Sequence, residues 1–298
     1  MQRFRCLQCA KTFSVNPLDG LRLEKSKLVQ IVKLLSEGLG VRGTARVTDC
    51  DPHTVLNVLQ TIGQKCEALH DRLVRNVQTE ALQLDEIWTR VRCTQKRANF
   101  KKYGDEFGDQ YTYLGIAAKE KLIVSFHTGK RNVENTDAFV CDLSRRIDGH
   151  VQVTTDSYRP YQTIVRNHLG GRLDYATMQK LYALPHNARQ EAVRRYSPSV
   201  CTGVRIRVQE GTPAREKINT SFIERSNLSV RHFNKRFARL TLGYSKTLEN
   251  HRYAIALFVT AYNFCKVHST LRSTPAVAAK VVAENWTIER LIEAVTAP

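Results

Sequence analysis

Short helices dominate the pattern of apolar and polar positions over the first quarter of the chain. Apolar residues recur at helical spacing between Leu28 and Leu35 and stop before Gly38, which predicts a helix that ends at this glycine. A second helix is predicted over residues 41–47, and a third begins at Pro52, which suits a first helical turn. The polar turn TDCDPH joins these two helices. Two short helices around a tight turn are typical of a helix-turn-helix, and a three-helix packing module is the alternative.

From residue 80 the spacing of apolar residues changes to that of strands. The segments EALQLDEIWTRVR, YTYLGIAAKE and KLIVSFHTG predict three consecutive strands, and the last two form a hairpin that turns at Lys119–Lys121. An amphipathic helix follows and stops at Gly149, and HVQVTTD is then a fourth strand. This order of elements predicts an α/β fold of RNase H-like type, with a mixed five-stranded sheet flanked by helices.

The remainder of the chain is predicted to pass through an irregular region before it returns to helices. The stretch between Asp156 and Glu224 is predicted to be partly irregular, with weak support for a helix near 158–168 and a strand near 204–209. It contains a basic insertion rich in turn residues, at about 169–215. Two helices follow, at about 216–240 and 247–266.

A last helix is predicted at 287–295, within a C-terminal tail. These patterns divide the chain into four parts. The predicted parts are an N-terminal segment over 1–20, a helix-turn-helix domain over 21–78, an RNase H-like domain over 79–270 and a helical tail over 271–298.

The chain carries a large excess of positive charge. Its 298 residues include 46 Lys and Arg against 28 Asp and Glu, a net charge of +18. Such an excess favours a polyanionic partner such as double-stranded DNA, because the release of counterions then drives binding. A basic surface without such a partner is the alternative. The clustering of basic residues argues against it, as in the loop that holds Lys96, Arg97, Lys101 and Lys102.

The apolar segments predict a protein of the cytoplasm, associated with the nucleoid rather than with a membrane. The longest apolar stretch, at 254–262, is far shorter than a bilayer span, and the N-terminus QRFRCLQCAK lacks the apolar region of a signal peptide. The eight cysteines are scattered, which predicts free thiols in a reducing compartment.

Three acidic residues stand in settings that predict catalysis. Asp85 and Asp156 lie on or just after predicted buried strands, and Glu224 lies in a predicted helix. A carboxylate buried at a strand end is unfavourable by several kcal/mol unless a cation or hydrogen-bond donors compensate for it. Oxygen ligands suit Mg²⁺ or Mn²⁺, and two such ions support phosphoryl transfer on nucleic acid. We expect Asp85 to bridge both ions, and Asp156 and Glu224 to complete one each.

The helix around Glu224 is predicted to have a packing face and a functional face. Glu224, Arg231 and Lys235 fall on one side, opposite a row of mainly apolar residues. We therefore predict DNA contacts from Arg231, Lys235 and the neighbouring Arg236, although an ordinary solvated face gives the same pattern.

Three other acids lie near these positions in the sequence. Glu210 and Glu216 are rivals to Glu224, but neither has the ERSN run that surrounds Glu224. Glu86 follows Asp85 on a strand, so we expect it on the opposite face of the sheet in a structural role.

Several motifs of the sequence resemble those of a known family. The run FIERSNLSVRHFNKRF, together with YNFCKVHSTLR followed by TP, is similar to the C-terminal region of DDE transposases of the bacterial insertion-sequence-one type. LQLDEIW and TTDSY resemble the first and second acidic motifs of that family, and the resemblance covers nearly the whole chain. It implies that Asp85, Asp156 and Glu224 are metal-binding catalytic acids, and that Arg231 contacts the DNA of a transposon end.

The resemblance also implies an activity. We expect a transposase that binds terminal inverted repeats, cleaves their 3′ ends and transfers them to target DNA, as a homodimer or higher oligomer. The predicted helix-turn-helix would contact DNA through four residues: Arg42, Thr44, Thr54 and Asn57. The alternatives are a non-catalytic repressor of the same element and, more weakly, a nuclease that acts on RNA–DNA hybrids.

The N-terminus departs from the family pattern. Transposases of this type usually begin with a complete zinc ribbon of two CxxC pairs, and here only Cys6 and Cys9 have that spacing. A structural zinc ion needs four ligands, so residues 1–20 are predicted to be the remnant of a ribbon, and bound zinc is doubtful.

Overall fold

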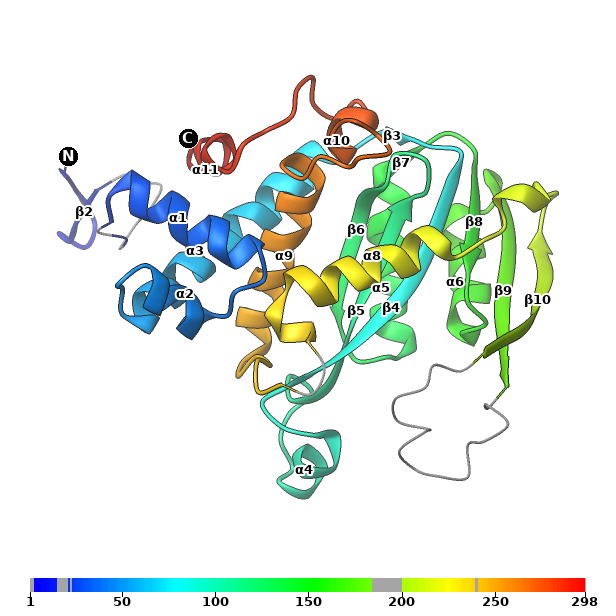
Figure 1. Cartoon of the computed structure of the whole chain (residues 1–298), viewed down its shortest axis with the longest axis horizontal. Helices are drawn as coiled ribbons and strands as arrows, with labels where there is room; N and C mark the ends of the chain where they lie inside the picture. The colour runs from blue at the N-terminus through cyan, green and yellow to red at the C-terminus, as the bar shows by residue number, and fades with distance from the viewer. Residues whose placement is uncertain (1–2, 15–20, 22, 184–199, 239–240, 298) are drawn as a thin grey trace.

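We describe a computed structural model of the chain, which covers residues 3–14, 21, 23–183, 200–238 and 241–297. A six-stranded mixed sheet with helices on both faces forms its centre (Figure 1). This arrangement is compatible with the predicted RNase H-like core. In spatial order the strands are β10 (Val200–Glu210), β9 (Leu173–Ala183), β8 (Val151–Thr155), β4 (Ala81–Val91), β5 (Gly108–Ala117) and β6 (Leu122–Gly129).

The strand directions combine two hairpins with a parallel centre. β4 and β6 each run antiparallel to β5, which lies between them. β8 lies parallel to both β4 and β9, and β10 returns antiparallel along β9. The predicted hairpin turn at Lys119–Lys121 is confirmed, since Ala117 pairs with Leu122 across it. The hairpin from β9 to β10 replaces much of the irregular insertion predicted over residues 169–215.

The prediction of five strands was wrong by one, because β9 was missed. The first half of β9 is buried between its neighbours, whereas its second half, from Gln179 onward, projects beyond β8 and is largely exposed. A strand that is buried at one end and exposed at the other has no uniform period-2 pattern, so its sequence resembles a loop.

Helices cover both faces of the sheet. α5 (Val133–Arg146) and α6 (Arg159–Leu169) lie on one face, and α8 (Ser221–Phe233) and α9 (Leu248–Phe264) lie on the other. The neighbouring residues Tyr113 and Leu114 of β5 show the division, because each is fully buried in a different core. The predicted helix at 216–240 ends earlier than expected, at Phe233.

Three N-terminal helices pack on α9 rather than forming a separate core. They are α1 (Lys25–Ser36), α2 (Val41–Val47) and α3 (Pro52–Leu73). Their apolar residues join those of α9 and of α11 (Ile288–Thr296) in one cluster. At the crossing of α3 and α9, a Cβ on Gly63 would lie 2.6 Å from the carbonyl oxygen of Tyr253, so only glycine permits this approach. The predicted boundary at residue 78 therefore does not separate two hydrophobic cores.

The other elements are short. They are β1 (Arg3–Arg5), β2 (Thr12–Ser14), β3 (Val77–Gln78), β7 (Ile147–Asp148), α4 (Gln95–Phe100), α10 (Pro275–Ala278) and the 3₁₀ turns η1 (Arg215–Lys217) and η2 (Lys235–Phe237). Among the described residues, no helix combines the length and the apolar character needed to span a membrane.

Candidate active site

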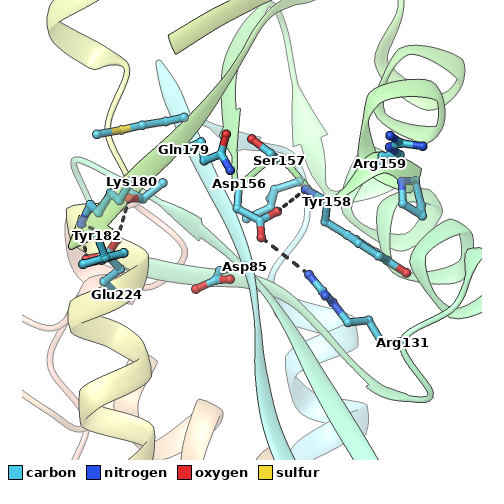
Figure 2. Close-up of a pocket in the computed structure, with 14 residues that line it drawn as sticks. Asp85, Arg131, Asp156, Ser157, Tyr158, Arg159, Gln179, Lys180, Tyr182 and Glu224 are labelled. Atoms are coloured by element: carbon cyan, nitrogen blue, oxygen red, sulfur yellow. Dashed lines mark hydrogen bonds and ion pairs between the residues drawn. The ribbon is translucent and has the colours of Figure 1, made fainter. Parts of the chain in front are cut away.

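The short strand β8 ends beside the middle of the longer parallel strand β4, and this brings two of the predicted acids together. The pairing of β4 with β8 runs from Ala81↔Gln152 to Leu84↔Thr155 and stops there. Asp85 and Asp156 are the next residues of the two strands, so their side chains meet at the end of the pair. Both line a cavity of about 570 Å³, which Figure 2 shows in close-up. The structure therefore brings these two acids together, and their catalytic role stays a prediction.

Asp85 is held in place by two hydrogen-bond donors and is largely buried. The backbone N–H of Glu86 donates to its Oδ1 at 2.8 Å, and Nδ2 of Asn227 on α8 donates to its Oδ2 at 2.8 Å. Burial raises the pKa of Asp85 to about 6, and the nearby charges of Asp156 and Glu224 add to this effect. The site thus disfavours the charged form of Asp85, which a bound cation would stabilise.

Glu86 is part of the cluster, contrary to the prediction of a separate structural role. One oxygen from each of Asp85, Glu86 and Asp156 lies within 4.8 Å of the others. Although neighbouring residues of a strand leave from opposite faces, β8 no longer flanks β4 at this level, so both side chains reach the same space. Burial raises the pKa of Glu86 to about 7, the charge of Asp156 adds to this, and Arg131 opposes it.

Arg131 supplies the positive charge that this cluster has in the structure. Its Nε lies 3.0 Å from Oε1 of Glu86, whose side chain is only 2% exposed, and its Nη2 lies 3.6 Å from Oδ2 of Asp156. The guanidinium also stacks over the ring of Tyr158 at 4.0 Å. The backbone N–H of Tyr158 donates to Oδ1 of Asp156 at 2.8 Å, which fixes that carboxylate.

Glu224 lines the same cavity but is paired elsewhere. Nζ of Lys180 on β9 donates to both of its carboxylate oxygens, at 2.5 and 2.6 Å, and Oγ1 of Thr220 donates to its Oε1 at 2.7 Å (Figure 2). Glu224 is not a member of the cluster of three acids. Its charge nevertheless reaches Asp85, since it contributes to the raised pKa of that group.

The start of α8 is fixed by a buried glutamine of β4. Gln83 accepts a hydrogen bond from the backbone N–H of Ile223 at 2.9 Å and donates to Oδ1 of Asn219 at 2.6 Å. The first N–H groups of a helix have no partner within the helix, so Gln83 satisfies one of them from outside. In this way β4 positions both Asp85 and the helix turn that carries Glu224.

Sequence reasoning missed several residues around the acids. Asn227 had a signal, because it lies three residues after Glu224 in the ERSN run and hence on the same side of the helix. Lys180 and Arg131 had none, since their partners are distant in sequence. The rivals Glu210 and Glu216 do not line the cavity: Glu210 pairs with Arg166, with Oε2 and Nε 3.4 Å apart, and Glu216 is exposed in η1.

The predicted basic face of the Glu224 helix is only partly realised. Arg231 lies near the end of α8 and is partly buried, with a partner of its own. Lys235 and Arg236 lie beyond the helix, in η2, because Asn234 leaves the helical conformation and donates from its side chain to the carbonyl of Ala254 at 3.1 Å. The prediction that they continue the helix face was therefore wrong.

Arg236 is directed into the protein rather than toward a ligand. Its Nε donates to Oγ of Ser245 at 2.7 Å, and burial lowers its pKa to about 10. A contact between this side chain and DNA would need the loop to open. Lys235 is exposed.

The four predicted contacts in the N-terminal helices differ in exposure. Arg42 and Asn57 are exposed and Thr54 is partly exposed, as a binding surface requires. Thr44 is completely buried, so the prediction that it contacts DNA was wrong in this conformation. It occupies the side of α2 that packs inward.

Cys6 and Cys9 lie in the turn between β1 and β2. Backbone and side-chain hydrogen bonds from Cys9 and a backbone bond from Gln8 lower the pKa of the Cys6 thiol. Within the described ranges, the three acids of β4 and β8 are the only group of three or more potential metal ligands, so no third ligand joins the two cysteines there.

Comparison with known proteins adds no relationship to this picture. No protein-family model matches the chain, and a search of curated proteins found no match.

Proposed function

We propose that the protein is a DNA transposase of the DDE type that uses a pair of Mg²⁺ or Mn²⁺ ions. Its reactions would be cleavage at the 3′ ends of an element and transfer of those ends to target DNA. The observation that carries the proposal is the meeting of Asp85, Glu86 and Asp156 within 4.8 Å, beside a cavity that Asp85, Asp156 and Glu224 line. The net charge of +18 supports a polyanionic substrate.

The donor set of the cavity fits such ions. All four groups offer carboxylate oxygens, which are the ligands that Mg²⁺ and Mn²⁺ prefer. Asp85 and Glu86 have raised pKa values because their charges are poorly compensated, so a cation between them would relieve an existing strain. Asp85, Asp156 and Glu86 would hold the first ion, and Glu224, once released from Lys180, would help to hold the second.

The protein's own part in the reaction is to position groups and balance charge. Bound divalent ions supply charge stabilisation at phosphorus and an activated water or 3′-hydroxyl. Asn227 and the backbone of Glu86 orient Asp85, and the N–H of Tyr158 orients Asp156. Lys180 lines the cavity and would be free to approach a phosphate when Glu224 turns to a metal ion.

The exposed residues of α2 and α3 would recognise the element's ends. Arg42 and Asn57 are accessible for this purpose, so helix-turn-helix binding through α2 and α3 belongs to the same proposal. Pairing of two ends would require at least a dimer of the chain.

The test is strand cleavage and transfer on DNA that flanks the gene, with Mg²⁺ or Mn²⁺. We expect Asp156→Asn to abolish both reactions, whereas Asp105→Asn, which removes an exposed carboxylate before β5, leaves them unchanged. Undiminished reactions in Asp156→Asn would rule the mechanism out. Full DNA affinity with no cleavage under either ion would favour the repressor instead.

A further inference from the structure

A second hollow opens beside the acid cavity at the edge of the sheet. Its volume is about 170 Å³, and it is lined by the start of α6, by β9 and by β10. Its lining residues are Ser157, Arg159, Gln162, Thr177, Gln179, Arg205 and Arg207. Ser157, Arg159 and Gln179 also line the acid cavity, so the two hollows adjoin each other.

The strand register places two of the arginines in this hollow. Arg205 pairs with Gln179 and Arg207 with Thr177, and residues two apart on a strand leave from the same face. The two side chains therefore lie on the face of the sheet that α6 covers, with origins about 6.7 Å apart along the strand. Arg159 begins α6 and approaches from the opposite wall.

The charges of the hollow are not neutralised within the described part of the chain. No described carboxylate forms an ion pair with Arg159, Arg205 or Arg207, and no acid lines the hollow. Arg166, two turns further along α6, behaves differently, because it pairs with Glu210 and donates to the carbonyl of Gln209. Arg166 thus attaches α6 to β10, whereas the three arginines of the hollow are left for another partner.

The other lining groups suit an anion with several oxygens. The amides of Gln162 and Gln179 and the hydroxyl of Ser157 can donate hydrogen bonds, and the first turn of α6 contains no acid to oppose the positive end of the helix dipole. Guanidinium groups bind phosphate oxygens in a bidentate way. A chain of phosphates that enters the acid cavity would continue into this hollow.

We propose that Arg159, Arg205 and Arg207 form a binding groove for the phosphodiester backbone of a nucleic acid whose neighbouring segment lies at the acids. The identity of the polyanion rests on the proposed function, but the groove is a distinct site on the β9–β10 hairpin and α6. It would set the path of the strand on one side of the cavity.

The experiment measures binding in EDTA, so that no cleavage can contribute. Fluorescence anisotropy of a labelled oligonucleotide, in single-stranded and duplex form, gives Kd at several salt concentrations. The variant is Arg205→Gln with Arg207→Gln. The matched control is Arg145→Gln with Lys280→Gln, which removes two exposed charges at the opposite end of the sheet. Arg159→Gln tests the groove from α6, in case changes in the edge strand disturb folding.

Each phosphate contact that is lost lowers the slope of log K against log salt, by about 0.9 on a duplex and about 0.7 on a single strand. We expect the slope of the double variant to be smaller by about 1.8 if the groove binds duplex, or by about 1.4 if it binds single strands. Binding at low salt should be about tenfold weaker. Arg159→Gln should lose about half as much, and Arg205→Lys with Arg207→Lys should retain most of the slope.

The groove would be refuted if Arg205→Gln with Arg207→Gln had the same Kd and salt slope as the control double variant, in both forms of nucleic acid. It would also be refuted if the wild type did not bind nucleic acid. The outcomes separate the two proposals. Arginine-dependent binding without cleavage would leave the groove standing and refute the transposase. Cleavage by the wild type, together with binding that does not depend on these arginines, would support the transposase and refute the groove.

Discussion

Replacing Asp85 by asparagine should stabilise the protein while removing the proposed activity. Asp85 is a largely buried acid whose pKa is raised from 3.8 to about 6 by burial and by the charges of Asp156 and Glu224. In the unfolded chain the same group ionises near its ordinary value. Above pH 6 folding therefore places a charge where it is disfavoured, and Asp85→Asn takes that charge away.

The size of the effect follows from the two pKa values. Below pH 3.8 the group is protonated in both states and has no effect on stability. As pH rises toward 6, the unfolded state loses the proton first, so the free energy of unfolding falls. One pKa unit is equivalent to about 1.4 kcal/mol, so the full effect is about 3 kcal/mol at pH 7.5 and about 1 kcal/mol at pH 4.5.

The surroundings can accept the amide. The N–H of Glu86 can still donate to an asparagine oxygen, as it now donates to Oδ1 of Asp85. Asn227 now donates to Oδ2 of Asp85, and its own Oδ1 is buried without a hydrogen-bond partner. If the amide of Asn227 turns over, that oxygen can accept from the new amide, so the new side chain keeps both of its hydrogen bonds. The Nδ2 of Asn227 then takes the buried position where its Oδ1 has no partner now.

Urea unfolding at pH 7.5 and at pH 4.5, in EDTA, measures the change. We expect Asp85→Asn to raise the free energy of unfolding by about 3 kcal/mol at the higher pH and by about 1 kcal/mol at the lower one. Asp105→Asn is the control, because it removes an exposed carboxylate. Added Mg²⁺ should stabilise the wild type more than the variant. A variant that is no more stable than the wild type at pH 7.5 would refute the claim that the cavity holds Asp85 under electrostatic strain.

Two further predictions concern the position of Glu224. Lys180→Gln removes the cation that holds this carboxylate, and because the two side chains are 26% and 44% exposed we expect a loss of only about 0.5 kcal/mol of stability. The Mn²⁺ concentration for half-maximal cleavage should fall about twofold, and an unchanged metal requirement would show that Lys180 does not compete with the ion. Gln83→Leu leaves the N–H of Ile223 without its acceptor and should lower the free energy of unfolding by about 2 kcal/mol. It should also slow cleavage through displacement of Glu224, whereas a variant of full stability and full activity would show that Gln83 does not fix the start of α8.

Predictions from local pattern were confirmed where an element packs in a uniform way. The helix predicted over 41–47 coincides with α2, and the last helix predicted at 287–295 lies within one residue of α11. The strands that became β4, β5, β6 and β8 were found because apolar or β-branched residues recur along them. In these segments the spacing of apolar side chains directly indicates which face is buried.

Predictions failed where a long-range contact overrode the local pattern. The helix of Glu224 stops at Phe233 because the side chain of Asn234 bonds to the carbonyl of Ala254, twenty residues further along the chain. β9 was missed because only half of it has neighbours on both sides. Neither contact leaves a periodic signal in the sequence.

The sequence by itself determined which side chains have the chemistry for the site, because residue type and local setting are properties of the chain. It indicated Asp85, Asp156 and Glu224 as acids near strand or helix positions. Only the tertiary structure decided which acids meet. The end of β8 beside Leu84 lets Glu86 join the cluster, and β9 places Lys180 against Glu224, 44 residues away. Such distances depend on how strands end and pair in space, and the order of residues along the chain does not specify them.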